Sequence, residues 1–183
     1  TLPMDPVTRL EADKDLVRLL LDRYGFLNRD LVLRENLQRD AQSWRWRDAF
    51  RALRIMELAG EVFSGQFFEA LSTPQFITPR NFLTLQSNQA PGENFWISAL
   101  DPVAPTGLSI KWDDLPQRRQ GNYLAFHGGE LALVLHSNGR QLDYLVPPDH
   151  NDLDAINSVL EHLVYNRRLR VSVREINKTP SKQ

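Results

Sequence analysis

The sequence predicts an α+β protein in which a winged helix-turn-helix is followed by a small antiparallel, barrel-like β-rich domain with a C-terminal helix and strand. Two observations predict this order. Three segments with helical spacing precede a hairpin pattern, and from residue 95 onward short apolar runs are separated by glycine turns. We therefore divide the chain into a linker (1–14), a winged-helix domain (15–90) and a β-rich C-terminal domain (91–183).

The composition is that of an ordinary globular protein, with 42% hydrophobic and 25% charged residues. No apolar run approaches the ~18 residues that span a bilayer, and no secretory leader opens the chain. Zero cysteines exclude disulfides, thiolate metal sites and a cysteine nucleophile. We therefore expect a cytoplasmic protein with no membrane partner. Because the chain opens on Thr1-Leu2-Pro3-Met4, we also expect an excised piece of a longer protein.

The charge is nearly balanced, with 22 Lys and Arg residues against 23 Asp and Glu residues. Affinity for phosphate rises with the number of cations that a protein presents to it. This balance argues against a histone-like, strongly basic binder, so any nucleic-acid surface is expected to be local.

The first predicted helix covers residues 15–24, where Asp15 favours the helix dipole and Gly25 ends the helix. Residues 1–14 contain two prolines and show no clear period, which favours a linker. Asn28 is a good N-cap for a second helix over residues 29–36.

The third predicted helix begins after a Ser43 cap and runs to Ala59, before Gly60. Its apolar residues follow helical spacing and form one buried stripe: Trp46, Ala49, Phe50, Leu53 and Met56. The period then changes, because residues 61–63, a turn at 64–66 and residues 67–71 predict a hairpin, with a trailing strand at 75–77.

The second half is predicted to be rich in strands. Turns at 127–129 and 137–139 join apolar runs as hairpins, and the predicted strands are 95–97, 123–126, 131–135 and 141–146. Asp152 or Asp154 is expected to cap a helix that runs to about Tyr165, with one apolar face made of Ile156, Val159, Leu160 and Leu163. A final strand is predicted over residues 169–176.

The outward face of the third helix is the predicted DNA-binding surface. Arg47, Arg51 and Arg54 are spaced by four and three residues and share one face, with Trp44 one turn earlier. In a winged helix this helix enters the major groove or follows the backbone. Arginines beside an aromatic ring suit phosphate contacts and base stacking.

The alternative for this face is an ordinary solvated surface with ion pairs to Asp48 and Glu57. If the face binds DNA, Arg45 would extend it. Gln66 lies at the predicted wing tip, where it would reach a groove or separate strands. A turn without further role is the alternative for Gln66.

Asp101 is the candidate catalytic residue. Residues 98–107 place two prolines and a glycine around it, which predicts a fixed, irregular loop of the kind that often has a function. A positioned carboxylate can act as a general base that activates water. The alternative is an Asx-turn, in which the carboxylate accepts hydrogen bonds from nearby backbone amides.

The histidines show no metal-binding spacing, since neither H-E-x-x-H nor an HxH pair is present, and no metal site is predicted. There is also no P-loop motif, so the chain itself is expected to bind no ATP and no other cofactor.

Several short motifs resemble, in order and spacing, the C-terminal region of large helicase-related (Lhr-type) proteins. Leu58–Val62, Gly65–Glu69 and Gln75–Pro79 are similar to one family segment, and Ala99–Gly107 with Trp112 resembles the family's A-T-D-P-A-N-P-Y-G…W. Three further motifs extend the resemblance over roughly residues 15–177: Gly129–Ala132, Asn138–Arg140 and Arg168–Val171.

The sequence departs from the family at a few positions. Thr106 stands where the family often has tyrosine, and Val103-Ala104 where it often has Ala-Asn. The family commonly closes on Ile-Asp-Gly, but this chain has Ile176-Asn177-Lys178, which weakens any acid–base role for its C-terminal end.

The resemblance implies a superfamily 2 DNA repair helicase whose motor lies upstream in the same polypeptide and uses ATP and Mg²⁺. This chain would be its accessory module, acting on single-stranded or forked DNA. The region also looks similar to tandem winged-helix DNA glycosylases, which position water beside an extruded base. Base excision is therefore the alternative function, and a protein-docking or homo-oligomerisation module is a third.

Overall fold

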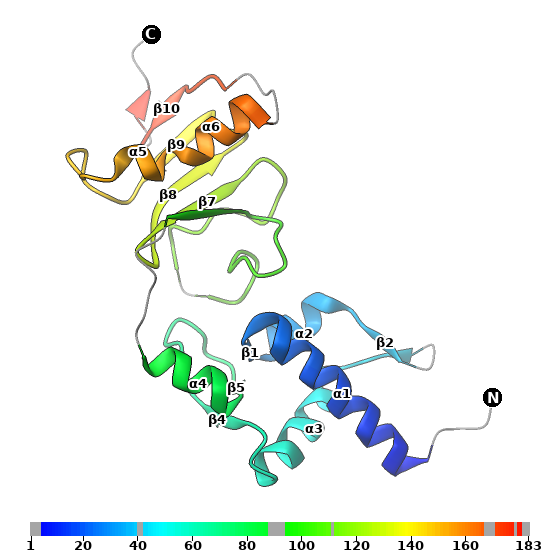
Figure 1. Ribbon diagram of the computed structural model, residues 1–183. Coiled ribbons are helices and arrows are strands. Elements are labelled where there is room, and N and C mark those ends of the chain that lie inside the picture. Colours follow the sequence, from blue (N-terminus) through cyan, green and yellow to red (C-terminus); the bar gives the residue numbers. More distant parts are fainter. Residues whose placement is uncertain are drawn as a thin grey trace. The chain divides into compact units, whose positions relative to one another are not determined.

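The computed structural model describes residues 5–39, 42–87, 94–110, 112–166, 171–177 and 179–180. The chain forms two compact units (Figure 1). The first consists of Thr1–Gln89 together with Leu108–Lys111, and the second of Ala90–Gly107 together with Trp112–Gln183. No helix in the described ranges is long and apolar enough to cross a membrane.

The first unit has the element order of a winged helix, as predicted. Its elements are α1 (Pro6–Tyr24), β1 (Phe26–Leu27), α2 (Arg29–Glu35), β2 (Gln38–Arg39), β3 (Gln42–Ser43), α3 (Trp46–Leu58), β4 (Phe63–Gly65), β5 (Gln75–Ile77) and α4 (Pro79–Gln86). Strands β1, β5 and β4 form one antiparallel sheet in that order, and β2 pairs with β3 between the second and third helices.

Helix α1 begins nine residues before the predicted start, so the expectation of a linker over residues 1–14 is wrong from Pro6 onward. The Asp5 carboxylate accepts hydrogen bonds from the backbone N–H of Val7 and Thr8, at 3.0 and 3.1 Å. Pro6 occupies the first helical position, where a missing N–H costs nothing because it has no acceptor within the helix. Gly25 ends the helix in the left-handed conformation at φ 79°.

Helix α3 begins two residues later than predicted. Ser43 belongs to β3, where it pairs with Gln38, and the N–H of Trp44 donates to the Leu37 carbonyl at 2.8 Å. Those bonds keep residues 43 and 44 extended, and Arg45 becomes the N-cap. Four apolar residues of α3 are buried against α1 and the sheet, namely Ala49, Ala52, Leu53 and Met56.

The wing differs from the predicted hairpin. The expected turn at 64–66 lies largely within β4, which pairs directly with β5, and residues 67–71 form no strand. The cause is Gln75, which is fully buried. Its Oε1 accepts the N–H groups of Phe67 and Phe68, both at 2.9 Å, and its Nε2 donates to the carbonyls of Phe68 and Leu71 at 2.9 and 3.1 Å. This amide satisfies backbone groups that a second strand pair would otherwise have bonded.

The second unit is built on one mixed sheet of order β11-β10-β9-β8-β7-β6. Its strands are β6 (Phe95–Ser98), β7 (Tyr123–His127), β8 (Glu130–His136), β9 (Gln141–Tyr144), β10 (Glu175–Ile176) and β11 (Thr179–Pro180). Strands β6 to β9 form an antiparallel meander, while β10 joins β9 in parallel. In the described part of the chain β6 and β11 are the two edges, so the sheet is open and the expectation of a barrel is wrong.

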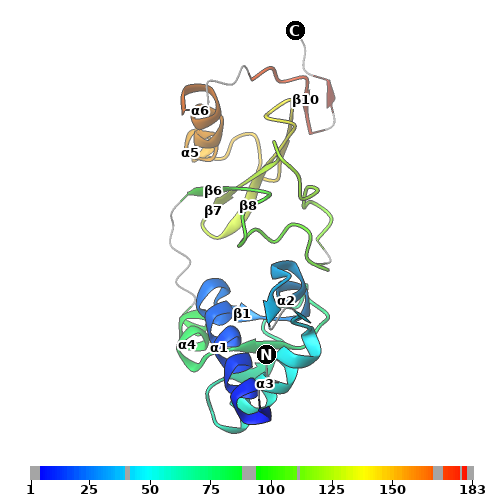
Figure 2. The ribbon, with the colours of Figure 1, turned by 90° about the vertical axis from the view of Figure 1, so that its right-hand side faces the viewer.

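Both faces of this sheet are covered, which explains the nearly continuous apolar runs in β7 and β8. Tyr123 and Ala125 face Ile156, Val159 and Leu163, which come from α5 (Leu153–Ile156), α6 (Ser158–Glu161) and the π-helical turn His162–Asn166. Alternate residues, such as Leu124 and Phe126, contact Ala99 and Leu115 of the long β6–β7 connection. Figure 2 shows the helices and this connection on opposite sides of the strands.

The apolar face predicted for the C-terminal helix is present, but Asn157 interrupts the helix, since it ends α5 and begins α6. The predicted final strand is mostly absent. Only Glu175–Ile176 pairs in β10, while residues 169–170 lie outside the described part.

Candidate nucleic-acid interface

The outward face of α3 has the predicted arginines. Arg47, Arg51 and Arg54 are all exposed, whereas Ala49 and Leu53 on the opposite face are fully buried. The helix therefore presents its guanidinium groups to solvent, as the spacing predicted.

A groove of about 420 Å³ runs between the first turns of α1 and α3, which pack side by side (Figure 1). Its lining includes Arg9 from α1 and both Arg47 and Arg51 from α3. We call these three residues the arginine groove. Arg9 was missed because it fell in the predicted linker; the signal was Asp5-Pro6, an N-cap followed by a proline suited to a first helical turn.

Two carboxylates also line this groove, and both are used within the unit. Asp13 is buried and accepts the indole N–H of Trp44 at 2.8 Å. Asp48 accepts the backbone N–H of its N-cap residue, Arg45, at 3.3 Å. Within the described ranges, no ion pair is found for Arg9, Arg47 or Arg51. The lining therefore has three guanidinium groups against two carboxylates, an excess of one positive charge, in a chain of net charge −1.

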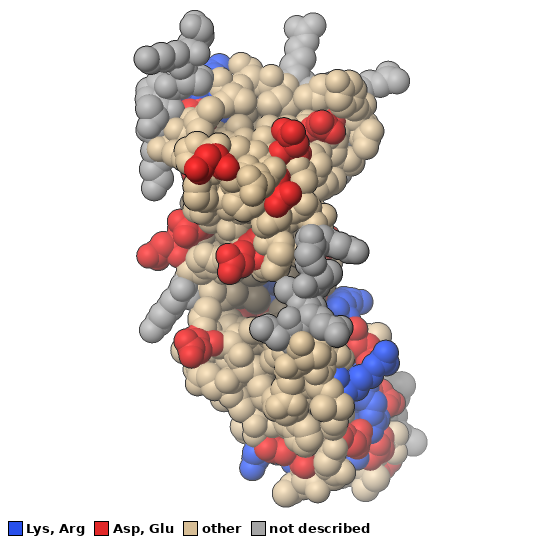
Figure 3. Space-filling model, turned by 60° about the vertical axis from the view of Figure 1, so that its left-hand side comes forward, with Lys and Arg blue, Asp and Glu red and all other residues tan. Residues whose placement is uncertain are grey.

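Arg54 behaves differently from its two neighbours on α3. Its guanidinium forms an ion pair with Glu57, which also accepts the hydroxyl of Ser64 at the start of the wing. The alternative of an ordinary ion-paired helix face is therefore correct for this residue. Figure 3 shows the same mixture on the visible face, where basic side chains of the first unit lie among acidic ones.

Trp44 is not available for stacking on bases, which corrects the sequence prediction. Its side chain is only 3% exposed, and its indole N–H is bonded to Asp13. Phe50, predicted to be buried, is instead 36% exposed. Its ring lies 5.5 Å from that of Trp46 and 5.9 Å from that of Phe76. Phe50 is the more exposed of the two aromatic side chains on α3, because Trp46 is half-buried.

The two remaining predicted DNA contacts have different surroundings. Arg45 is exposed at the N-terminus of α3. Gln66 does not lie at a hairpin tip, because the residue before it still pairs with Gln75 and its own Nε2 donates to the Leu71 carbonyl at 3.0 Å. The prediction that Gln66 forms the wing tip is wrong for this reason.

Asp101 lies in the second unit and forms the predicted Asx-turn. Its Oδ1 accepts the N–H of Val103 at 2.9 Å. The guanidinium of Arg118 donates to the carbonyls of Ala99, Leu100 and Asp101, at 2.9 to 3.2 Å, so the loop is held on its backbone. The Asp101 carboxylate thus has a structural partner, and it lines neither the arginine groove nor the pocket described next.

A pocket of about 220 Å³ in the second unit is lined by Tyr144, Val146, Pro147, Pro148, Leu153, Asn157, Ile176 and Asn177. The Tyr144 hydroxyl donates to Asn157 Oδ1 at 2.6 Å, and the Tyr144 N–H donates to Asn177 Oδ1 at 2.7 Å. Burial raises the pKa of Tyr144, an effect that the bond to Asn157 opposes without cancelling. The pocket is an apolar cleft with two side-chain amides whose N–H₂ groups are not used in these bonds.

Residues 7–94 match the family model described as large helicase-related protein, winged-helix domain. This match covers nearly half of the chain and shows that the first unit is similar to that winged-helix domain. The chain is also similar, at 27% identity over 196 residues, to the Lhr helicase/uracil glycosylase of Escherichia coli strain K12. That alignment covers all of this chain and 12% of the relative's length. Together the two matches confirm the Lhr-type resemblance that the sequence motifs indicated.

Proposed function

We propose that the winged-helix unit binds DNA through the arginine groove, as an accessory module of a DNA repair helicase whose ATP-dependent motor lies in the same polypeptide, in the cytoplasm. One observation supports this most directly. Arg9, Arg47 and Arg51 converge from two helices without forming ion pairs in the described ranges, while both neighbouring carboxylates are bonded elsewhere.

Guanidinium groups suit this role because they bind phosphate oxygens with two parallel hydrogen bonds. Helix α3 is the element that a winged helix places in or along the major groove. The arginine groove lies at the N-terminal half of α3, beside α1, so a phosphate backbone would follow the line between the two helices.

Exposed Phe50 favours DNA with unpaired bases. An aromatic side chain beside a basic groove offers a stacking surface to any base that is not in a duplex. Phe50 lies three residues after Arg47 on α3 and is therefore its neighbour on the helix surface, so a strand whose phosphates contact the groove would place a base within reach of this ring. Forked or single-stranded DNA is therefore the proposed ligand.

A salt titration tests the proposal. Binding of the full chain to a fluorescent forked DNA is measured by anisotropy at several salt concentrations. Each lost phosphate contact lowers the slope of log affinity against log salt by roughly 1, so Arg47→Ala/Arg51→Ala is expected to lower it by about 2. Arg54→Ala is the matched control, since Arg54 already pairs with Glu57, and we expect it to change the slope by less than about 1.

An unchanged slope in the double variant would remove the arginine groove from the interface. No DNA binding at all, combined with self-association on a sizing column, would instead favour the docking or oligomerisation function. Both variants should melt like the wild-type chain, because the replaced side chains are exposed.

Excision of uracil is the second candidate, because the Escherichia coli relative is named a uracil glycosylase and the Tyr144 pocket has suitable chemistry. Uracil has two carbonyl groups, and the pocket offers the amides of Asn157 and Asn177 as donors. Incubation of the full chain with uracil-containing DNA tests this, with Asn177→Ala and Asp101→Asn compared with wild type. If only Asp101→Asn lost excision activity, the catalytic residue would be in the Asp101 loop rather than in the Tyr144 pocket. If the wild-type chain showed no turnover, this chain would not excise uracil.

A further inference from the structure

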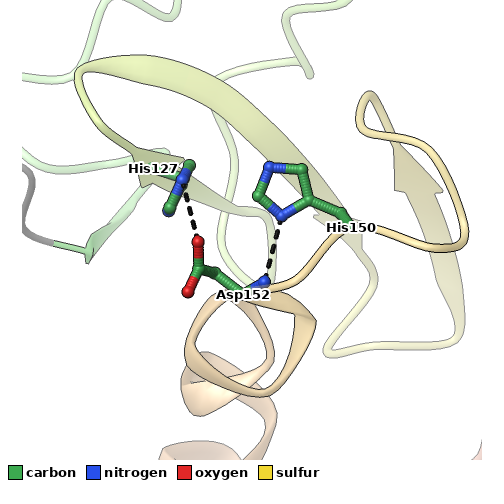
Figure 4. Close-up of side chains that lie close together, drawn as sticks. All are labelled: His127, His150 and Asp152. Atoms are coloured by element: carbon green, nitrogen blue, oxygen red, sulfur yellow. Dashed lines mark hydrogen bonds and ion pairs between the residues drawn. The ribbon is translucent and has the colours of Figure 1, made fainter.

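Three side chains with metal-binding atoms converge in the second unit, far from the arginine groove in sequence. Figure 4 shows His127, His150 and Asp152 turned toward one another. One ligand atom from each can be chosen so that all three lie within 4.8 Å of one another. The sequence spacing gave no warning of this group, because 23 residues separate the two histidines.

Regular elements place the three residues. His127 is the last residue of β7 and pairs with Glu130 across a turn formed by Gly128 and Gly129, both at positive φ. Asp152 immediately precedes α5, and His150 is held by its N–H, which donates to the Pro147 carbonyl at 3.1 Å. Groups fixed on a strand end and a helix start lose little freedom when they bind an ion.

The hydrogen bonds of His127 orient its ring for ligation. Its Nδ1 lies 2.6 Å from Asn94 Oδ1, and because an amide oxygen only accepts, Nδ1 has the proton. In the neutral ring Nε2 therefore has a lone pair, and this atom faces Asp152 Oδ2 at 3.4 Å. A hydrogen bond that fixes one ring nitrogen so that the other faces a metal is typical of histidine ligands.

The other two groups also present lone pairs. Asp152 occupies the N-cap position of α5, yet its side chain makes no capping hydrogen bond and points at His127 instead. An N-cap aspartate normally bonds the first turn of its helix. His150 Nδ1 accepts the backbone N–H of Asp152 at 3.2 Å, so this nitrogen is unprotonated, and binding an ion through Nδ1 would replace this long hydrogen bond.

We propose that His127 Nε2, His150 Nδ1 and the Asp152 carboxylate bind a divalent ion of the zinc class, with a fourth position open to water. Two imidazoles and one carboxylate suit Zn²⁺, whereas Mg²⁺ and Ca²⁺ require mainly oxygen ligands. In a tetrahedral site with Zn–N bonds of about 2.0 Å, ligand atoms lie roughly 3.3 Å apart. The 3.4 Å between His127 Nε2 and Asp152 Oδ2 already matches, and the remaining separations, which lie within 4.8 Å, must shorten by up to about 1.5 Å.

The competing explanation is a metal-free ion pair between a protonated His127 and Asp152. The two differ in their response to zinc. A metal site takes up Zn²⁺ and is stabilised by it, whereas an ion pair between the two side chains gains nothing from the ion.

The experiment uses the full chain, purified without a histidine tag and treated with a chelator. ZnCl₂ is titrated by calorimetry at neutral pH, and thermal unfolding is followed with Zn²⁺ or Mg²⁺. We expect one Zn²⁺ per chain, a raised melting temperature with Zn²⁺ only, and the visible absorption of four-coordinate Co²⁺ when that ion is substituted. The absence of cysteines means that no thiolate competes for the ion.

Variants identify the ligands. His127→Gln and His150→Gln should each weaken Zn²⁺ binding by well over tenfold, and Asn94→Ala by about tenfold through the lost orientation of His127. His136→Gln is the matched control, since His136 also faces a carboxylate, with Nε2 3.1 Å from Asp143, but has no second histidine.

Undetectable Zn²⁺ binding by the folded wild-type chain overturns the proposal. So does Zn²⁺ binding that survives in His127→Gln/His150→Gln, because the ion would then lie elsewhere. Circular dichroism verifies that each variant is folded, and Asp152→Asn gives a further test, since it leaves both imidazoles in place.

Discussion

Arg118 in the second unit and Arg47 and Arg51 in the first unit differ in the partners of their guanidinium groups. In the second unit, Arg118 donates to three backbone carbonyls and holds the loop around Asp101. In the first unit, Arg47 and Arg51 line a groove without an ion-pair partner among the described residues. Arg118 is therefore an internal connector, and Arg47 and Arg51 differ both from it and from Arg54, which forms an ion pair within the first unit.

Glutamines and aromatic residues of the first unit also divide into side chains that are bonded inside the unit and side chains that are exposed. Gln75 uses its whole amide on backbone groups, while the exposed Gln66 side chain makes one part-buried bond. Trp44 is buried and bonded, while Phe50 is exposed. A polar or aromatic side chain whose hydrogen bonds are satisfied inside the unit contributes to stability, and one left exposed is available for a ligand. Replacing members of these pairs tests this distinction.

The largest effect is expected for Gln75→Ala. Removing this buried amide leaves the N–H groups of Phe67 and Phe68 without their acceptor, and we expect a loss of about 3 kcal/mol in the free energy of unfolding. Gln66→Ala removes one part-buried bond, and the Leu71 carbonyl keeps Gln75 as a donor, so the change should cost under about 1 kcal/mol. Urea unfolding of the full chain measures both. Equal losses would show that burial does not separate the two glutamines.

Arg118→Ala should cost about 2 kcal/mol, because the Leu100 and Asp101 carbonyls lose a charged donor. The adjacent, exposed Arg119 provides the control, and Arg119→Ala is expected to stay within about 0.5 kcal/mol of wild type. The double variant Arg47→Ala/Arg51→Ala should also stay within about 0.5 kcal/mol. If it were as destabilising as Arg118→Ala, the groove arginines would be structural, and the contrast between the units would fail.

Trp44→Phe should lower stability by about 1.5 kcal/mol, since the buried Asp13 loses the indole donor. Its DNA affinity should equal that of wild type at temperatures where the variant is folded. Phe50→Leu should weaken binding to single-stranded DNA by roughly fivefold, because the stacking surface is lost. It should lower the free energy of unfolding by less than Trp44→Phe does. Melting curves and fluorescence anisotropy measured on the same samples separate the effect on stability from the effect on DNA binding. If folded Trp44→Phe bound DNA more weakly than wild type, Trp44 would be part of the DNA-binding surface after all.

The smallest effect concerns Glu35. Burial raises the pKa of this carboxyl, but hydrogen bonds from Tyr24 and Arg23 outweigh burial and hold the pKa below its ordinary value of 4.5. Because the folded pKa is lower than the unfolded one, the stabilisation is present above about pH 4.5 and is lost as the pH falls through the folded pKa. The pair is partly exposed, so we expect under about 1 kcal/mol.

Glu35→Gln should therefore lower stability slightly at neutral pH and show a shallower decline in acid. Urea midpoints measured from about pH 6 to pH 3 provide the test. Glu11→Gln is the control, because Glu11 is exposed and forms only an i,i+3 pair with Lys14. If the urea midpoint of Glu35→Gln fell with pH as steeply as that of wild type, the Glu35 carboxylate would not contribute to the acid sensitivity of the fold.

Local spacing predicted much of the fold. The three-residue and four-residue steps in α3 placed Leu53 and Met56 in the core and Arg47 and Arg51 outside, as observed. The Asx-turn considered for Asp101 is present for the same reason, since it depends on residues two positions apart. These features involve neighbours along the chain, so the sequence contains all that they require.

Long-range contacts decided the rest. Spacing could not distinguish Trp44 from Trp46, because the burial of Trp44 depends on a carboxylate 31 residues away. Gln75 gave the wing its shape by bonding backbone groups that no pattern identifies as unpaired. The open sheet follows from β10 pairing in parallel with β9, across more than thirty residues of chain.

Sequence alone thus determined the helical faces, the glycine turns and the placement of several arginines on one face of α3, because each depends on backbone geometry over a few residues. Tertiary structure decided which of those arginines lack a partner, brought Arg9 from α1 alongside α3, and gathered His127, His150 and Asp152. The physical reason is that hydrogen bonds and ion pairs are formed between groups close in space, and the partner of a side chain is set by packing rather than by its position in the chain.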